Sequence, residues 1–183
     1  MDKTMKHIVV IVGSPRKNGN TELLADAFIK GARSVGNTVE TISVIGKKIG
    51  GCLGCNACYR DAQHRCALHD DMEVCYKRLS EADVIVIATP IYFYGVSSQL
   101  KCLIDRLHNP IRNSFKVKKL GLLAVCADDR ESVFDSVVTM YRSILNYFSL
   151  SDGGVVTVCG VSEKGDIKGN PKLKAAQEMG RTI

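Results

Sequence analysis

Short apolar runs alternate with longer amphipathic segments along most of this chain. The first run, from His7 to Val12, is rich in β-branched residues and ends at Gly13, which predicts a strand buried on both faces. Strands of this kind are typical of a parallel sheet covered on both sides. Five segments have the pattern of strands: residues 7–12, 38–45, 84–88, 119–126 and 154–159.

Segments whose apolar residues have helical spacing separate these strands. In the first of them, Asn20 and Thr21 offer an N-cap and Gly36 marks the end. The predicted helices cover residues 20–36, 71–82, 97–107 and 133–148, with a short one from about residue 171. Alternating strands and helices require right-handed crossovers, so we expect one α/β domain over residues 1–183, with a parallel sheet between two helical layers.

The carboxyl ends of the strands are where such a sheet binds its ligands. The loop after the first strand contains Ser14, Arg16, Asn20 and Thr21 and opens a helix, an arrangement that favours an anion. It lacks the motif of a P-loop and the glycine pattern of a dinucleotide fold, so we expect a phosphate monoester. The alternative is an ordinary capped turn.

The loop after the third strand carries three successive aromatic residues, Tyr92, Phe93 and Tyr94, between Pro90 and Gly95. Flat apolar walls combined with backbone donors and acceptors suit a planar ring such as isoalloxazine. The alternative is an apolar plug beneath a neighbouring subunit.

Several motifs in the same order resemble the NADPH-dependent FMN reductase family of the flavodoxin-like superfamily. They are Gly13-Ser14-Pro15-Arg16 with Gly19-Asn20-Thr21, Ala82-Asp83, Thr89-Pro90-Ile91-Tyr92, and Ser98-Gln99-Leu100-Lys101 leading to Ile104-Asp105-Arg106. The resemblance implies a flavodoxin-like three-layer α/β/α sandwich with a five-stranded parallel sheet. A cysteine-rich insert, residues 46–70, would follow the second strand.

FMN is the cofactor that the resemblance implies, with NAD(P)H as co-substrate. It assigns the FMN phosphate to Ser14, Arg16, Asn20 and Thr21, and the flavin ring to Pro90, Ile91, Tyr92, Phe93 and Gly95. Because the flavin itself carries the electron chemistry, we nominate no catalytic side chain. A third flavin loop in this family follows the fourth strand, and residues 127–130 are left unassigned.

Four of the eight cysteines fall within fifteen residues: Cys52, Cys55, Cys58 and Cys66. The C-x2-C-x2-C spacing with a fourth cysteine nearby is typical of [4Fe-4S] ligation and resembles the iron-sulfur flavoproteins of this family. Free redox-active thiols and a zinc site remain as alternatives. We expect His64 and His69 to be surface residues.

The other four cysteines are dispersed along the chain: Cys75, Cys102, Cys126 and Cys159. We expect them to be small buried apolar residues, because a cytoplasmic chain does not use its cysteines as a disulfide framework. The apolar run near the N-terminus is too short for a signal sequence or a membrane span, so we expect a cytoplasmic protein with no membrane partner.

The formal charge of +6 comes from scattered basic residues, which is more typical of a solvated surface than of a nucleic-acid interface. The function expected is an oxidoreductase that moves electrons from NAD(P)H, or a reduced carrier such as ferredoxin, to a flavin, a quinone or a similar small acceptor. The family also implies a homodimer or homotetramer. The alternatives are a flavodoxin-like electron carrier and a cysteine-based redox sensor.

Overall fold

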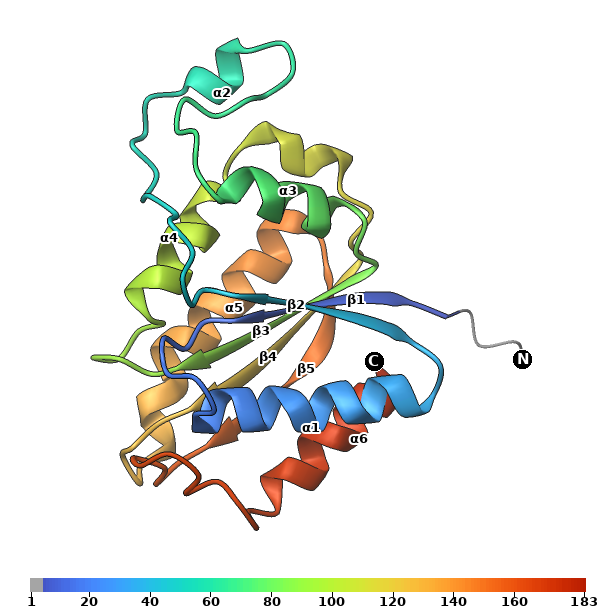
Figure 1. The fold of residues 1–183 in the computed structure, drawn as a ribbon, viewed down its shortest axis with the longest axis vertical. Helices are drawn as coiled ribbons and strands as arrows, with labels where there is room; N and C mark the ends of the chain where they lie inside the picture. The colour runs from blue at the N-terminus through green and yellow to red at the C-terminus, as the bar shows by residue number, and fades with distance from the viewer. Residues whose placement is uncertain (1–4) are drawn as a thin grey trace.

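A computed structural model describes residues 5–183, so residues 1–4 of the predicted domain lie outside it. Five parallel strands form one sheet in the order β2-β1-β3-β4-β5 (Figure 1). The strands are β1 His7–Val12, β2 Thr38–Ser43, β3 Val84–Pro90, β4 Lys119–Val125 and β5 Ser151–Val158. The strand order reverses between β1 and β3, which makes this pair the topological switch point.

Helices cover both faces of the sheet, as Figure 1 shows, which confirms the predicted flavodoxin-like α/β/α sandwich. One face is covered by α1 and α6, and the opposite face by α3, α4 and α5. The α-helices are α1 Asn20–Ser34, α2 Ala57–Arg60, α3 Met72–Ser80, α4 Ser98–Arg106, α5 Asp135–Phe148 and α6 Lys172–Thr182. Short 3-10 helices at Pro110–Ser114 and Glu131–Phe134 were not predicted.

Successive side chains of β1 point to opposite faces of the sheet, and each face has its own apolar core. Val10 and Val12 point into the core beneath α1 and α6, whereas Val9 and Ile11 point into the core beneath the other helices. Every residue of β3 is buried, as expected for the central strand of a covered sheet. None of the helices within residues 5–183 combines the length and apolar character needed to cross a membrane.

Strand β5 begins at Ser151, three residues earlier than predicted. The pairing of β4 with β5 shifts register between Leu120 and Leu122, so the early part of β5 lacks regular strand alternation. Asp152 stabilises this irregular region, because its carboxylate accepts hydrogen bonds from the Tyr141 hydroxyl at 2.6 Å and the Gly154 N–H at 2.7 Å.

Two glycines allow α1 and α6 to touch through their backbones. A Cβ at Gly31 would lie 1.8 Å from the Gln177 carbonyl oxygen, and one at Gly180 would lie 2.1 Å from the Phe28 carbonyl oxygen. Both distances are far below van der Waals contact, so neither position tolerates a side chain unless the helices separate.

We therefore expect Gly31→Ala to destabilise the protein, although alanine is the better helix former. The gain in helix propensity is about 1 kcal/mol, whereas forcing the helices apart costs about 3 kcal/mol. Urea denaturation should show a net loss of about 2 kcal/mol. Lys30→Ala, at the exposed neighbouring position, should change the free energy of unfolding by less than about 0.5 kcal/mol. Equal stability of Gly31→Ala and the wild type would contradict this close packing.

Candidate active site

Gly13 and Ser97 join the loops that follow β1 and β3. The Gly13 N–H donates to the Ala88 carbonyl at 2.7 Å, and the Gly13 carbonyl accepts from the Ser97 hydroxyl. Ser97 also caps α4 by accepting from the Leu100 N–H at 3.2 Å. A Cβ at Gly13 would lie 2.5 Å from Leu100, so only glycine lets the first loop approach α4 this closely.

The loop after β1 ends at the N-terminus of α1, where the first backbone N–H groups of the helix lie. Gly19 is the N-cap residue, and among the described residues no side chain caps this helix end. The first N–H groups of a helix have no acceptor within the helix, so they remain available to an anion. Ser14 and Thr21 are buried beside this end, and the Ser14 hydroxyl accepts from the Arg16 N–H at 3.1 Å.

The side chain of Asn20 makes a different set of contacts from those the sequence suggested. Its amide nitrogen donates to the Glu163 carbonyl at 2.8 Å, and its oxygen accepts from the N–H groups of Gly165 at 3.0 Å and Ile167 at 3.3 Å. The side-chain amide therefore holds the loop between β5 and α6. The backbone N–H of Asn20 still belongs to the free helix end.

The aromatic loop after β3 is a tight turn. Tyr92 and Gly95 exchange backbone hydrogen bonds of 2.8 and 3.1 Å, and the two central residues, Phe93 and Tyr94, have φ values of +47° and +63°. Glycine and asparagine dominate such positive-φ turns, so two aromatic residues here store backbone strain. The Phe93 side chain is 99% exposed, which makes it the outermost apolar group of this loop.

One cavity of about 170 Å³ brings the two predicted loops together at the carboxyl edge of the sheet. Seven of the nine predicted flavin residues line it: Ser14, Arg16, Asn20, Thr21, Pro90, Ile91 and Tyr92. Phe93 and Gly95 do not line it. We call this space the carboxyl-edge cavity.

The carboxyl-edge cavity also has walls that the sequence analysis did not identify. Val125, Cys126 and Ala127 come from the end of β4, and Val161, Ser162 and Lys164 come from the loop after β5. The signal that could have found them is topological, since these residues also follow parallel strands. Of the unassigned segment 127–130, only Ala127 reaches the cavity.

Positive charge dominates the rim of the carboxyl-edge cavity. Arg16 and Lys164 line it, and no carboxylate does so among the described residues. The Arg16 guanidinium donates to the Ser162 carbonyl at 3.0 Å, which links the first loop to the loop after β5. The arrangement suits a ligand with a phosphate at one end and an apolar ring system at the other.

The four clustered cysteines surround a second, smaller cavity of about 40 Å³. They lie on the segment between β2 and α3 that carries α2 and extends beyond α3 (Figure 1). Burial raises the pKa of the Cys58 thiol, and the nearby thiols of Cys66, Cys52 and Cys55 raise it further. Within the described residues, no group of three or more histidine, cysteine or acidic side chains is arranged to hold a metal ion.

Both histidines near these cysteines have other partners. A ring nitrogen of His64 lies 3.0 Å from the Cys58 carbonyl oxygen, and His69 pairs with Glu73 on the surface at 3.2 Å. Neither residue lines the cysteine cavity.

A buried ion pair fastens both ends of the cysteine segment to α4. The Arg106 side chain, on a residue 2% exposed, donates to the Asp70 carboxylate at 2.9 and 3.2 Å and to the Gly50 carbonyl at 3.0 Å. Asp70 in turn accepts from the N–H groups of Gly50 and Met72. Burial alone would raise the Asp70 pKa, but these hydrogen bonds outweigh it and hold the pKa below its ordinary value.

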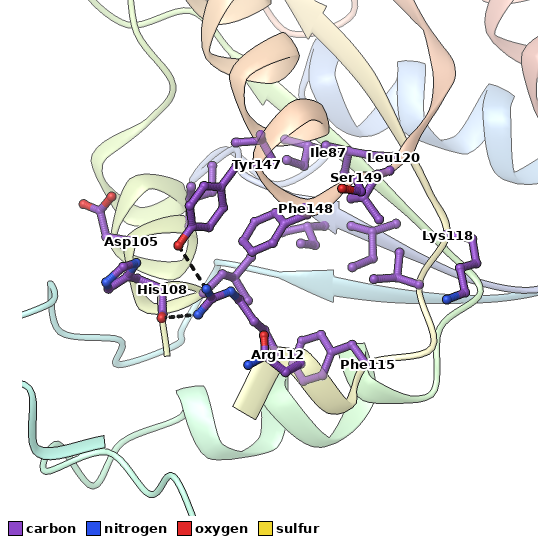
Figure 2. A pocket seen from close by; sticks show the side chains of 18 residues that line it. Ile87, Asp105, His108, Arg112, Phe115, Lys118, Leu120, Tyr147, Phe148 and Ser149 are labelled. Carbon is purple, nitrogen blue, oxygen red and sulfur yellow. Dashed lines mark hydrogen bonds between the residues drawn. The ribbon is translucent and has the colours of Figure 1, made fainter. Parts of the chain in front are cut away.

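A cavity of about 640 Å³ lies between the sheet and helices α4 and α5 (Figure 2), and it shares His108 with the cysteine cavity. Arg112 crosses it, donating to the Tyr147 hydroxyl at 3.0 Å and to the His108 carbonyl. Its guanidinium also stacks on the Tyr147 and Phe148 rings, 5.3 and 5.2 Å from their centroids. None of the predicted flavin or cysteine residues lines this space.

Comparison with known proteins identifies relatives of this chain. The pattern of the NADPH-dependent FMN reductase family matches residues 6–157. An iron-sulfur flavoprotein from Methanocaldococcus jannaschii is 39% identical over 77% of this chain and 70% of its own length. Another from Archaeoglobus fulgidus is 32% identical over 96% of this chain and 77% of its own.

The fold comparison agrees with the architecture. The crystal structure of an azoreductase from Bacillus anthracis superposes with a TM-score of 0.76, covering 98% of this chain and all of that one, at 14% identity. At this identity the similarity concerns the fold alone.

We expect Asp70→Asn to lower the free energy of unfolding at pH 7 by about 3 kcal/mol, because Arg106 would lose its buried counter-charge. Since the folded pKa of Asp70 is depressed, the unfolded chain binds the proton more readily, and this stabilisation should disappear as the pH falls below about 4. Urea denaturation should therefore show that the difference in free energy of unfolding between Asp70→Asn and the wild type becomes smaller as the pH is lowered from 7 to 3.

Glu73→Gln is the matched control. Among the described residues Glu73 forms an ion pair with the exposed His69, so this variant should change the free energy of unfolding by less than about 0.5 kcal/mol. A difference between Asp70→Asn and wild type that stays constant with pH would contradict the ion-pair account.

Proposed function

Since the chain belongs to the NADPH-dependent FMN reductase family, we propose that it holds FMN in the carboxyl-edge cavity, moves electrons from NAD(P)H to a small acceptor, and carries a [4Fe-4S] cluster on its clustered cysteines. The chain is thus an oxidoreductase with FMN as its cofactor. The observation that carries the proposal is the meeting of both predicted flavin loops around one cavity.

The phosphate end of FMN would lie against the N-terminus of α1. The uncapped N–H groups there, the buried hydroxyls of Ser14 and Thr21, and the Arg16 and Lys164 cations provide donors and charge for a dianion. Asn20 supports this site indirectly, through its hold on the loop that presents Lys164.

The ring end would lie between Pro90, Ile91 and Tyr92 on one side and the end of β4 on the other. FMN supplies the chemistry when bound, accepting a hydride and releasing the electrons singly or in pairs. The residues that line the cavity would orient the ring. No general acid or base is needed from the chain for hydride acceptance, so we assign none.

Cys52, Cys55, Cys58 and Cys66 would hold the cluster. Their placement around one cavity supports this assignment, although the four thiols are not arranged as a ligand set before a metal binds. Arg106 lines the same cavity, and its positive charge would offset part of the charge of four thiolates.

We propose a flavin, a quinone or a similar small molecule as the electron acceptor. Ferredoxin is the alternative electron donor, and the proposed location is the cytoplasm. A homodimer or homotetramer stays a prediction. Association would give the exposed Phe93 and Tyr94 rings an apolar surface to contact. Steady oxidation of NAD(P)H by the purified protein would separate an enzyme from a carrier or a sensor.

Removing positive charge from the cavity should weaken the binding of FMN more than that of riboflavin, which lacks the phosphate. We expect Arg16→Ala and Lys164→Ala each to raise the Kd for FMN roughly tenfold, with the Kd for riboflavin unchanged, by fluorescence titration. Lys168→Ala, on the same loop but outside the cavity, should leave both unchanged. Equal weakening of both ligands would contradict a phosphate contact.

The cluster assignment predicts the iron content of protein purified without oxygen. Wild-type protein should contain about four irons and four labile sulfides per chain, with a broad absorption shoulder near 400 nm. Cys55→Ser should lose most of the iron and keep the flavin bands, whereas Cys102→Ser, outside the cluster segment, should match the wild type. A wild-type protein that takes up no iron after anaerobic reconstitution would restrict the proposal to flavin chemistry.

A further inference from the structure

Two cysteines outside the cluster segment meet at the wall of the carboxyl-edge cavity. Cys126 follows β4, Cys159 follows β5, and their sulfur atoms are 3.8 Å apart. Cys126 lines the cavity and Cys159 does not. Cys126 is a buried member of a small apolar cluster with Phe134, and the partly buried Cys159 packs against that cluster. Neither thiol has a role in the function proposed above.

Backbone hydrogen bonds fix this pairing. The last register pair of β4 and β5 is Val125 and Val158. Beyond it the Cys126 N–H donates to the Val158 carbonyl and the Cys126 carbonyl accepts from the Val161 N–H, both at 2.9 Å, so the two chains stay bonded although the ladder becomes irregular. Neighbouring strands are about 4.8 Å apart, and the Cα atoms of disulfide-bonded cysteines are about 4.4 to 6.8 Å apart. Adjacent strands therefore have a spacing compatible with a disulfide, and the sulfur atoms are already 3.8 Å apart.

We propose that Cys126 and Cys159 form a redox-active dithiol that exchanges two electrons with the flavin in the carboxyl-edge cavity. The inference rests on the proposed FMN site for its oxidant. In the oxidising direction both S–H bonds break, one S–S bond forms, and two electrons and two protons pass to the oxidised isoalloxazine, giving dihydroflavin. The reverse exchange restores both thiols.

The two thiols are chemically unequal. Burial raises the pKa of Cys126 to about 12, and its hydrogen bond to Cys159 contributes to that rise. Burial also raises the pKa of Cys159, but the same hydrogen bond opposes the rise there. Cys159 is thus the thiol that loses its proton first, and Cys126 is the one that faces the cavity.

Counting electrons tests the proposal directly. Flavin-loaded protein is treated with diamide, freed of it, and titrated anaerobically with dithionite while the visible spectrum is recorded. Wild-type protein should take up about two electrons per chain more than Cys159→Ser. Cys102→Ser is the control. It removes a thiol that is not part of the Cys126–Cys159 pair, so its electron uptake should match that of the wild type. If Cys159→Ser fails to fold, Cys126→Ala replaces it.

Peptide mapping of the same diamide-treated samples, alkylated and left unreduced, provides a second readout. A linked peptide joining residues 126 and 159 is expected in wild type and absent from Cys159→Ser. Equal electron uptake by wild type and Cys159→Ser, without the linked peptide, would overturn the proposal. If wild-type protein bound no flavin, the proposed function would fail, and the linked peptide alone would decide whether the dithiol exists.

Discussion

The site depends on a constraint of parallel sheets, which is that strands paired in register end at the same edge. β1, β3 and β4 pair without interruption, so the residues after Val12, Pro90 and Val125 emerge side by side. Ser97 then joins the first two loops by bonding the Gly13 carbonyl while capping α4. A cavity with one polar and one apolar end follows from these backbone relations, with few long side chains needed to build it.

Local chemistry made much of this predictable. The loop from Gly13 to Thr21 and the aromatic run after β3 are recognisable because their residue types are unusual at strand ends. The role of the Asn20 amide could not be predicted from the sequence, because its partners at 163–167 lie more than 140 residues further along the chain. The early start of β5 was missed because Ser151 and Asp152 are exposed and belong to the strand through their pairing with Lys119 and Leu120, which the hydrophobic pattern does not reveal.

The cysteine segment has a different basis of stability from the sheet. It has few buried residues of its own. Polar contacts hold it instead: the Asp70–Arg106 pair at its ends, and between them the Asn109 amide on the His64 carbonyl and the Tyr59 hydroxyl on His108. A segment held by polar contacts and not by a packed core has low local stability and can adjust its conformation. That combination is what a group of thiols needs if they are to converge on a metal centre after folding.

The close contact of α1 with α6 through Gly31 and Gly180 joins segments separated by most of the chain. During synthesis β1 and α1 leave the ribosome long before α6, yet the sheet face that α1 covers is complete only when α6 has emerged. The nascent protein therefore exposes apolar surface on that face until translation of α6 is finished. Final closure of the sandwich is accordingly a late, long-range step, and the nascent chain is most open to chaperones before it.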